Sequence, residues 1–123
     1  MSKKRLLIVD DESDIRDLCA VIILRSFDLI ITKAASVKEA KKIIGENPQD
    51  LAILDLNLPD GVGFELVAPL KKANDNVKFL FVTAHNQCSD KKKAEELGAV
   101  KIIGKPFKSE ELINTIRNIL NKT

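Results

Sequence analysis

The chain has 123 residues, of which 45% are hydrophobic and 31% charged, and this is enough for one globular domain with a sizeable buried core. We therefore expect a single domain over residues 1–123. Twenty basic and eighteen acidic side chains give a formal net charge of +2, which is too balanced to indicate binding to nucleic acid or to a membrane by charge alone. No apolar run approaches the length of a membrane span, and the first residues carry no cleavage-site pattern. The sequence predicts a soluble, cytoplasmic protein.

Short apolar runs alternate with helix-length segments along the chain. We expect buried strands at residues 6–9, 29–31, 51–54, 79–82 and 100–103, each bounded by polar or turn residues. A first helix over 12–26 carries an apolar stripe that we expect in the core: Ile15, Leu18, Cys19, Ile22 and Ile23. Cys19 is then a core-filling thiol, whereas Cys88 lies among polar residues and is predicted to be a surface thiol.

Four further helices are predicted after the second strand. Ser36 and Glu39 have the spacing of a capping box, which predicts a second helix ending at Gly45. The third helix, about 63–74, contains Pro69, which should shorten or kink it. The fourth spans about 87–97, where only Cys88, Ala94 and Leu97 could anchor it, so it should be the least firmly packed. The fifth begins at Ser109.

Five strands alternating with five helices indicate an α/β fold with a parallel sheet covered on both faces, because parallel neighbours need crossover connections. We predict a doubly wound, flavodoxin-like (βα)5 domain with strand order 2-1-3-4-5. Ligands of such sheets bind at the carboxyl ends of the strands, where the strand order reverses between strands 1 and 3.

Chemically active side chains stand at the ends of four predicted strands. Asp10 and Asp11 follow the first strand, Asp55 the third, Thr83 the fourth and Lys105 the fifth. Each alone would be an ordinary turn or capping residue. Because the four strands deliver them to one edge of the sheet, their joint placement indicates a site.

Three carboxylates in contact need a positive partner, since two like charges about 4 Å apart cost on the order of 4 kcal/mol at an effective dielectric of 20. Lys105 can neutralise one of them. Oxygen ligands with no His or Cys nearby favour Mg²⁺ over zinc for the rest. Several acids, a lysine and Mg²⁺ together suggest phosphate chemistry in which a carboxylate attacks.

Four stretches, "LLIVDDE", "LAILDLNLPDGVGFEL", "FLFVTA" and "KIIGKPF", resemble in order and spacing the receiver domain of two-component response regulators. The resemblance covers essentially the whole chain, and as a set these motifs are highly specific. It implies a signalling switch that promotes only its own phosphorylation and dephosphorylation. It also implies transfer of a phosphoryl group to Asp55 from the phosphohistidine of a sensor histidine kinase or a phosphotransfer protein.

The resemblance further implies the roles of the other site residues. Asp11 and Asp55 resemble the carboxylate ligands of Mg²⁺ (or Mn²⁺), the backbone carbonyl of Asn57 a third ligand, and Asp10 the residue that holds metal-bound water. Thr83 resembles the hydroxyl residue that hydrogen-bonds the phosphoryl group.

The strand 5 region matches the family in one respect and departs from it in another. Lys105 resembles the charge partner of the phosphoryl group. Receiver domains commonly have a cis peptide bond after this lysine, so the resemblance implies one between Lys105 and Pro106. Family members usually carry Tyr or Phe where this chain has Ile102, so the aromatic rotamer switch coupled to Thr83 cannot operate in its usual form. We therefore expect phosphorylation to act through the fourth helix.

The resemblance leaves the partners open. The face formed by the fourth helix, fifth strand and fifth helix is expected to bind a downstream protein or a second copy of the chain when phosphorylated. A fused output domain is an alternative. Direct binding to nucleic acid or to a membrane is not expected, and Lys91, Lys92 and Lys93 are interpreted as a solvated helix face.

Two other protein classes are alternatives for this site. A Mg²⁺-dependent phosphohydrolase with an aspartyl nucleophile would act on free substrates, but it needs a substrate pocket or cap for which the chain has little room. A flavodoxin should have a phosphate loop rich in Ser, Thr and Gly, whereas the loop after strand 1 is acidic. His85, the one histidine, is interpreted as a polar loop residue near the phosphoryl group.

Overall fold

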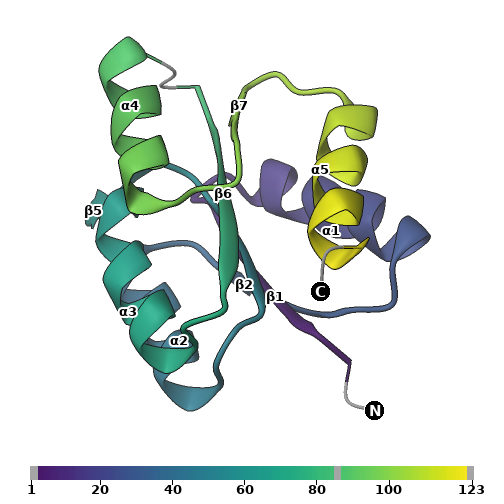
Figure 1. The fold of residues 1–123 in the computed structure, drawn as a ribbon, viewed down its shortest axis with the longest axis horizontal. Coiled ribbons are helices and arrows are strands. Elements are labelled where there is room, and N and C mark those ends of the chain that lie inside the picture. The colour runs from purple at the N-terminus through teal and green to yellow at the C-terminus, as the bar shows by residue number, and fades with distance from the viewer. Residues whose placement is uncertain (1–2, 85–86, 122–123) are drawn as a thin grey trace.

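The computed structural model describes residues 3–84 and 87–121 and has three layers, with a five-stranded parallel sheet in the middle (Figure 1). The sheet strands are β1 (Arg5–Val9), β2 (Ile30–Ala34), β3 (Leu51–Leu54), β6 (Lys78–Thr83) and β7 (Ile102–Gly104), in the order β2-β1-β3-β6-β7. If only the strands of this sheet are numbered along the chain, the order is 2-1-3-4-5, so the predicted topology is confirmed. The switch point lies between β1 and β3.

Helices cover both faces of the sheet. In Figure 1, α1 (Ser13–Ser26) and α5 (Ser109–Asn121) lie on one face, and α2 (Val37–Glu46), α3 (Val67–Ala73) and α4 (Cys88–Leu97) on the other. Along β1, Leu7 and Val9 join the core beneath α2, α3 and α4, whereas Leu6 and Ile8 join the core beneath α1 and α5. The central strands are buried on both faces, which is why they read as continuous apolar runs.

Two strands differ from their predicted positions. β2 occupies Ile30–Ala34 rather than 29–31, because it is an edge strand whose backbone pairs with β1 through polar residues that the apolar pattern did not include. β7 begins at Ile102 rather than at Val100, because the parallel pairing with β6 starts at Ile102. Val100 precedes the strand and is exposed.

Helix α1 corrects the prediction for Leu18. Cys19, Ile22 and Ile23 are buried as expected, but Leu18 is 48% exposed. Leu18, Val21 and Leu24 follow one another at three-residue intervals on the outer side of the helix and are all about half-exposed. Helix α1 therefore has an exposed apolar face in addition to its buried one.

The two cysteines lie where the sequence predicted. Cys19 is buried, and its burial raises the pKa of the thiol to about 11. Cys88 is exposed, so it is a surface thiol as predicted but does not anchor α4, as the sequence had also suggested. Within α4 the buried residue is Ala94, and Leu97 is partly buried.

The segment predicted as one helix over 63–74 is divided. A 3-10 turn, η1 (Gly63–Leu66), precedes α3, which begins at Val67. Pro69 lies in the first turn of α3, where an amide N–H would have no partner within the helix, so it fits there without breaking the helix. Before η1, β4 (Asn57–Leu58) and β5 (Gly61–Val62) form a two-stranded antiparallel hairpin where only a turn was expected.

None of the helices in residues 3–84 and 87–121 is long and apolar enough to cross a membrane.

Candidate phosphorylation site

The loops after β1 and β3 bring the acidic residues together at the carboxyl edge of the sheet. The N–H of Asp55 donates to the carbonyl of Val9 (2.9 Å), and the N–H of Asp10 donates to the carbonyl of Ala34 (3.0 Å). These bonds continue the strand pairing one residue beyond β1 and β3. Asp10 and Asp55 are therefore held on a rigid backbone, and both side chains are buried.

Lys105 reaches this cluster from the loop after β7. Its ammonium nitrogen lies 2.7 Å from Asp10 Oδ2 and 2.9 Å from Asp55 Oδ2. It also lies 3.1 Å from Glu12 Oε1. The Lys105 N–H donates to the carbonyl of Thr83 (3.0 Å), which fixes the backbone from which the side chain extends. One cation thus contacts three carboxylates.

The electrostatics follow from this crowding. Burial by itself would lower the pKa of Lys105, but its hydrogen bonds to Asp10, Asp55 and Glu12 outweigh burial and raise that pKa. Burial raises the pKa of Asp10, and the hydrogen bonds from Lys105 and from the Glu12 N–H offset this only in part. The ammonium is firmly charged, and the carboxylates around it outnumber it.

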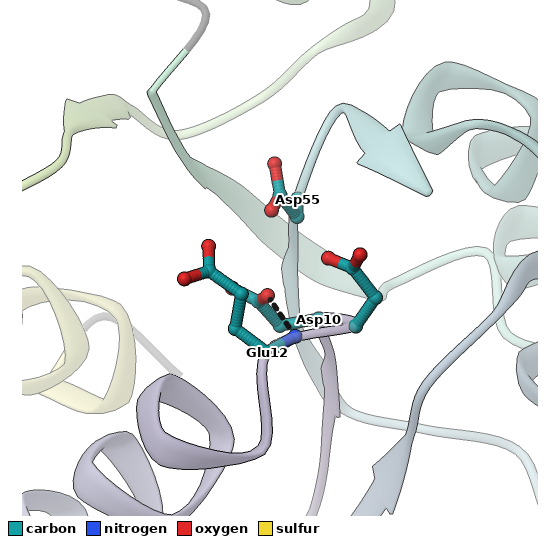
Figure 2. A group of neighbouring side chains, drawn as sticks. Asp10, Glu12 and Asp55 are labelled. Atoms are coloured by element: carbon teal, nitrogen blue, oxygen red, sulfur yellow. Dashed lines mark hydrogen bonds between the residues drawn. The ribbon is translucent and has the colours of Figure 1, made fainter. Parts of the chain in front are cut away.

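The acidic group has the composition of a site for a hard divalent cation. One carboxylate oxygen from each of Asp10, Asp11, Glu12 and Asp55 lies within 4.8 Å of the others. Figure 2 shows Asp10 and Glu12 on the loop after β1, facing Asp55 at the end of β3. Ligands that are all oxygen favour Mg²⁺, Mn²⁺ or Ca²⁺. The donor set fits the predicted cofactor class.

Three of these acids line an open pocket of about 280 Å³. Its walls are Asp11, Glu12, Asp55, Asn57, Ala84 and Lys105. The N–H of Asn57 donates to Asp55 Oδ1 (3.2 Å), so this carboxylate is fixed on one side by a backbone amide and on the other by Lys105. Thr83 ends β6 with a fully buried side chain, and the next residue, Ala84, forms the wall there.

Gly63 allows the chain to pass close behind the site. A Cβ on Gly63 would lie 2.1 Å from the backbone oxygen of Asp55, and the Gly63 N–H donates to the carbonyl of Leu56 (2.9 Å). A side chain would therefore displace the backbone that carries Asp55. The requirement for glycine here comes from this close approach.

Asp60 fixes the β4–β5 hairpin to α2. Its two carboxylate oxygens accept hydrogen bonds from the N–H groups of Val37 (2.8 Å) and Lys38 (2.9 Å), and Ser36 accepts from Glu39 at the same helix end. The backbone hydrogen bonds from Lys38 and Val37 lower the pKa of Asp60. The loop that carries Asn57 is thereby held by the start of a helix.

The structure brings together most of the predicted site. Asp11, Asp55, Asn57 and Lys105 line one pocket, and Asp10 contacts Lys105 beside it. Thr83 directly precedes the wall residue Ala84. The Lys105–Pro106 peptide bond is cis, as expected. His85 lies outside the described residues.

Two residues add to the sequence interpretation. Ile102 is half-buried and packs against the core beneath α2, α3 and α4. Glu12, which the pattern of strand-end residues did not indicate, contacts Lys105. Its position directly after Asp10 and Asp11 was the available signal, but the reach of its side chain could not be read from the sequence.

Comparison with known proteins identifies the family. The sequence model of one protein family, the response regulator receiver domain, matches residues 6–117 of the chain. The chain belongs to this family. The receiver domain is 33% identical to the response regulator PilR of Pseudomonas aeruginosa over 124 residues, 98% of this chain and 28% of PilR. It is 35% identical to the response regulator SaeR of Staphylococcus aureus over 117 residues, 95% of this chain and 50% of SaeR. The chain thus spans half or less of the length of these two relatives.

Solved structures agree with this fold. A receiver domain from Methanospirillum hungatei superposes with a TM-score of 0.90 at 30% identity, with 98% of this chain and 96% of that one covered. The non-phosphorylated HemR receiver domain of Leptospira biflexa gives a TM-score of 0.87 at 31% identity, with 98% and 97% covered. The receiver domain is a signalling domain, and the family assignment does not favour the phosphohydrolase alternative.

Proposed function

We propose that this receiver domain accepts a phosphoryl group on Asp55 from the phosphohistidine of a sensor kinase or a phosphotransfer protein. The observation that carries the proposal is the setting of Asp55. Its carboxylate is buried, lies 2.9 Å from the Lys105 ammonium and receives the Asn57 N–H, yet it forms part of the wall of an open pocket. A nucleophile held rigidly at an accessible surface can react without rearrangement of the backbone.

In the proposed transfer, an Asp55 oxygen forms a bond to phosphorus as the phosphorus–nitrogen bond to histidine breaks. Lys105 neutralises a phosphoryl oxygen, and Thr83 hydrogen-bonds another. Asp11 and Asp55, with the carbonyl of Asn57, would hold Mg²⁺ or Mn²⁺. Bound there, the cation neutralises charge on the phosphoryl group.

Asp10 has a supporting role in this proposal. Its carboxylate pairs with Lys105 and would hold metal-bound water. Burial of Asp10 and Asp55 together is tolerable in the resting domain because Lys105 bridges them.

The test is the intact mass of the protein before and after treatment with a small acyl phosphate in the presence of Mg²⁺. We expect the mass of one phosphoryl group on the unaltered chain and none on Asp55→Asn. Asp11→Asn should lose the labelling at limiting Mg²⁺. Asp14→Asn is the matched control, since Asp14 is an exposed acid in the first turn of α1 and should label normally. Undiminished labelling of Asp55→Asn would contradict the assignment.

We also propose that the exposed apolar face of α1 contacts the phosphodonor protein. Leu18, Val21 and Leu24 are each about half-exposed on the helix that begins at the pocket, and an apolar surface beside a reaction site favours protein docking. Val21→Glu should slow phosphotransfer from the donor protein at least tenfold but leave labelling by a small acyl phosphate unchanged. Equal effects on both donors would contradict this role.

The proposed output is the face of α4, β7 and α5. It carries Lys91, Lys92, Lys101 and Lys108 in exposed positions, and Lys101 pairs with Glu111 at 3.7 Å. Phosphorylation adds about −1.5 to −2 charge beside Asp55. With Ile102 in place of an aromatic ring, we propose that α4 shifts and that this face then binds an acidic partner surface or a second copy of the chain.

A further inference from the structure

Glu12 occupies a helix-capping position but its side chain does not cap the helix. It is the N-cap of α1 with extended backbone angles, and its carbonyl accepts the N–H groups of Ile15 and Arg16 (both 3.1 Å). Short polar side chains are preferred at this position because they bond to the N–H groups of the first turn. The Glu12 side chain makes no such bond. The longer side chain of Glu12 instead makes a contact elsewhere.

That contact is with Lys105, 93 residues along the chain. Lys105 already has two buried partners, Asp10 and Asp55, on its inner side. Glu12 is the third partner, at 3.1 Å, and its side chain is 61% exposed. The ammonium therefore contacts an exposed side chain on its solvent side and two buried side chains on its protein side.

The Glu12 backbone is fixed although its side chain is exposed. Its N–H donates to Asp10 Oδ1 at 2.9 Å, the bond drawn in Figure 2. The Arg16 guanidinium donates to the carbonyl of Asp10 at 2.7 Å. These two bonds fix the backbone of the loop that carries Asp10 and Glu12, so the Glu12 side chain starts from a fixed point within reach of Lys105.

We propose that Glu12 is a positioning residue: it holds Lys105 in the resting domain and must release it when a phosphoryl group arrives on Asp55. The proposal rests on the function proposed for Asp55. A phosphoryl oxygen and the Glu12 carboxylate compete for the same ammonium, and they repel each other. Glu12 therefore favours the unphosphorylated state.

The first test asks whether Glu12 contacts Lys105 in the resting chain. With lysine side chains labelled with 13C, the Lys105 signal, assigned by its loss in Lys105→Met, should shift in Glu12→Gln. It should stay in place in Asp14→Asn, which removes the same charge from the first turn of α1. An unshifted signal in Glu12→Gln would overturn the contact. This measurement does not depend on phosphorylation.

The second test measures beryllofluoride binding at saturating Mg²⁺. We expect Glu12→Gln to bind about two- to fivefold more tightly than the unaltered chain, the range for an ion pair with one exposed partner, and Asp14→Asn to differ by less. The gain should shrink as salt is raised. An unchanged affinity in Glu12→Gln, or equal gains in both variants, would overturn the proposal. Loss of binding in all three proteins would instead count against the function proposed for Asp55.

Discussion

At the scale of single residues, Gly63 and Gly45 offer a matched pair. Gly63→Ala would place a Cβ 2.1 Å from the Asp55 carbonyl oxygen, whereas a Cβ at Gly45 meets nothing within 4 Å. We expect Gly63→Ala to lower the free energy of unfolding by about 1–3 kcal/mol and to reduce phosphoryl labelling. Gly45→Ala, on the exposed side of α2, should raise stability by up to about 1 kcal/mol. Urea denaturation measures both.

Similar stability of Gly63→Ala and Gly45→Ala would contradict the close approach behind Asp55. Labelling should be normal in Gly45→Ala, since that glycine lies outside the pocket.

The residues at the strand ends were predictable because parallel strands bring their carboxyl ends to one edge. Asp10, Asp55 and Lys105 could be placed together on this ground, without coordinates. The part played by Glu12 could not, because the contact depends on how far a flexible side chain extends across a gap between two loops. The same limit applies to Gly63, whose constraint arises only from the path of the backbone behind Asp55.

At the scale of elements, α4 is held by few apolar contacts and by two lysines. Its buried residue is Ala94. Lys71 of α3 donates to the carbonyl of Leu97 at 2.7 Å, and the Lys93 ammonium lies 5.2 Å from the centre of the Phe64 ring. We expect the amides of α4 to exchange hydrogen faster than those of α2 and α5, and their protection to change when beryllofluoride is added.

Hydrogen exchange followed by mass spectrometry measures this behaviour of α4. Lys71→Met should speed exchange in the last turn of α4, while Lys72→Met, on the neighbouring exposed position, should not. A change on adding beryllofluoride that is confined to another face of the domain would contradict the proposed role of α4.

The stability that Asp60 contributes by joining the hairpin to α2 should depend on pH. The pKa of Asp60 is lowered by the N–H groups of Lys38 and Val37, so Asp60 stabilises the fold above its unfolded pKa of about 3.9. This contribution is lost as the pH falls through the lowered value. Asp60→Asn should therefore have a lower urea midpoint at pH 7, and the difference should narrow towards pH 2. A difference that is constant with pH would contradict the charged cap.

The spacing of apolar residues predicted which helices and strands exist, and their order. It predicted less well which side of each helix is exposed. Helix α1 is apolar nearly all round, so its sequence does not show which side meets the sheet, and Leu18 was placed wrongly for this reason. The hairpin of β4 and β5 was missed because two-residue strands are too short to show a period. The edge strand β2 was shifted because its pairing uses backbone groups rather than apolar side chains.

At the scale of the whole molecule, the charge imbalance of the pocket should link stability to Mg²⁺. The site holds four carboxylates but only one ammonium, which contacts three of them. A bound divalent cation should therefore raise the melting temperature by several degrees, equivalent to about 2.7 kcal/mol at a concentration 100 times the Kd. Chelation should reverse the rise, and Asp11→Asn should reduce it. An equal rise with NaCl at matched ionic strength would show that screening alone is responsible.

The separation of Lys105 from its partners also has a consequence during synthesis. Asp55 precedes Lys105 by 50 residues and Glu12 precedes it by 93. At roughly 5–20 residues per second, the ribosome adds the last pocket acid roughly 3–10 s before the lysine. The nascent chain thus contains the acids of the pocket before their counter-charge exists. Because pairing of β1 with β3 is what brings these acids together, their mutual repulsion should disfavour assembly of the pocket until the loop that carries Lys105 has been added.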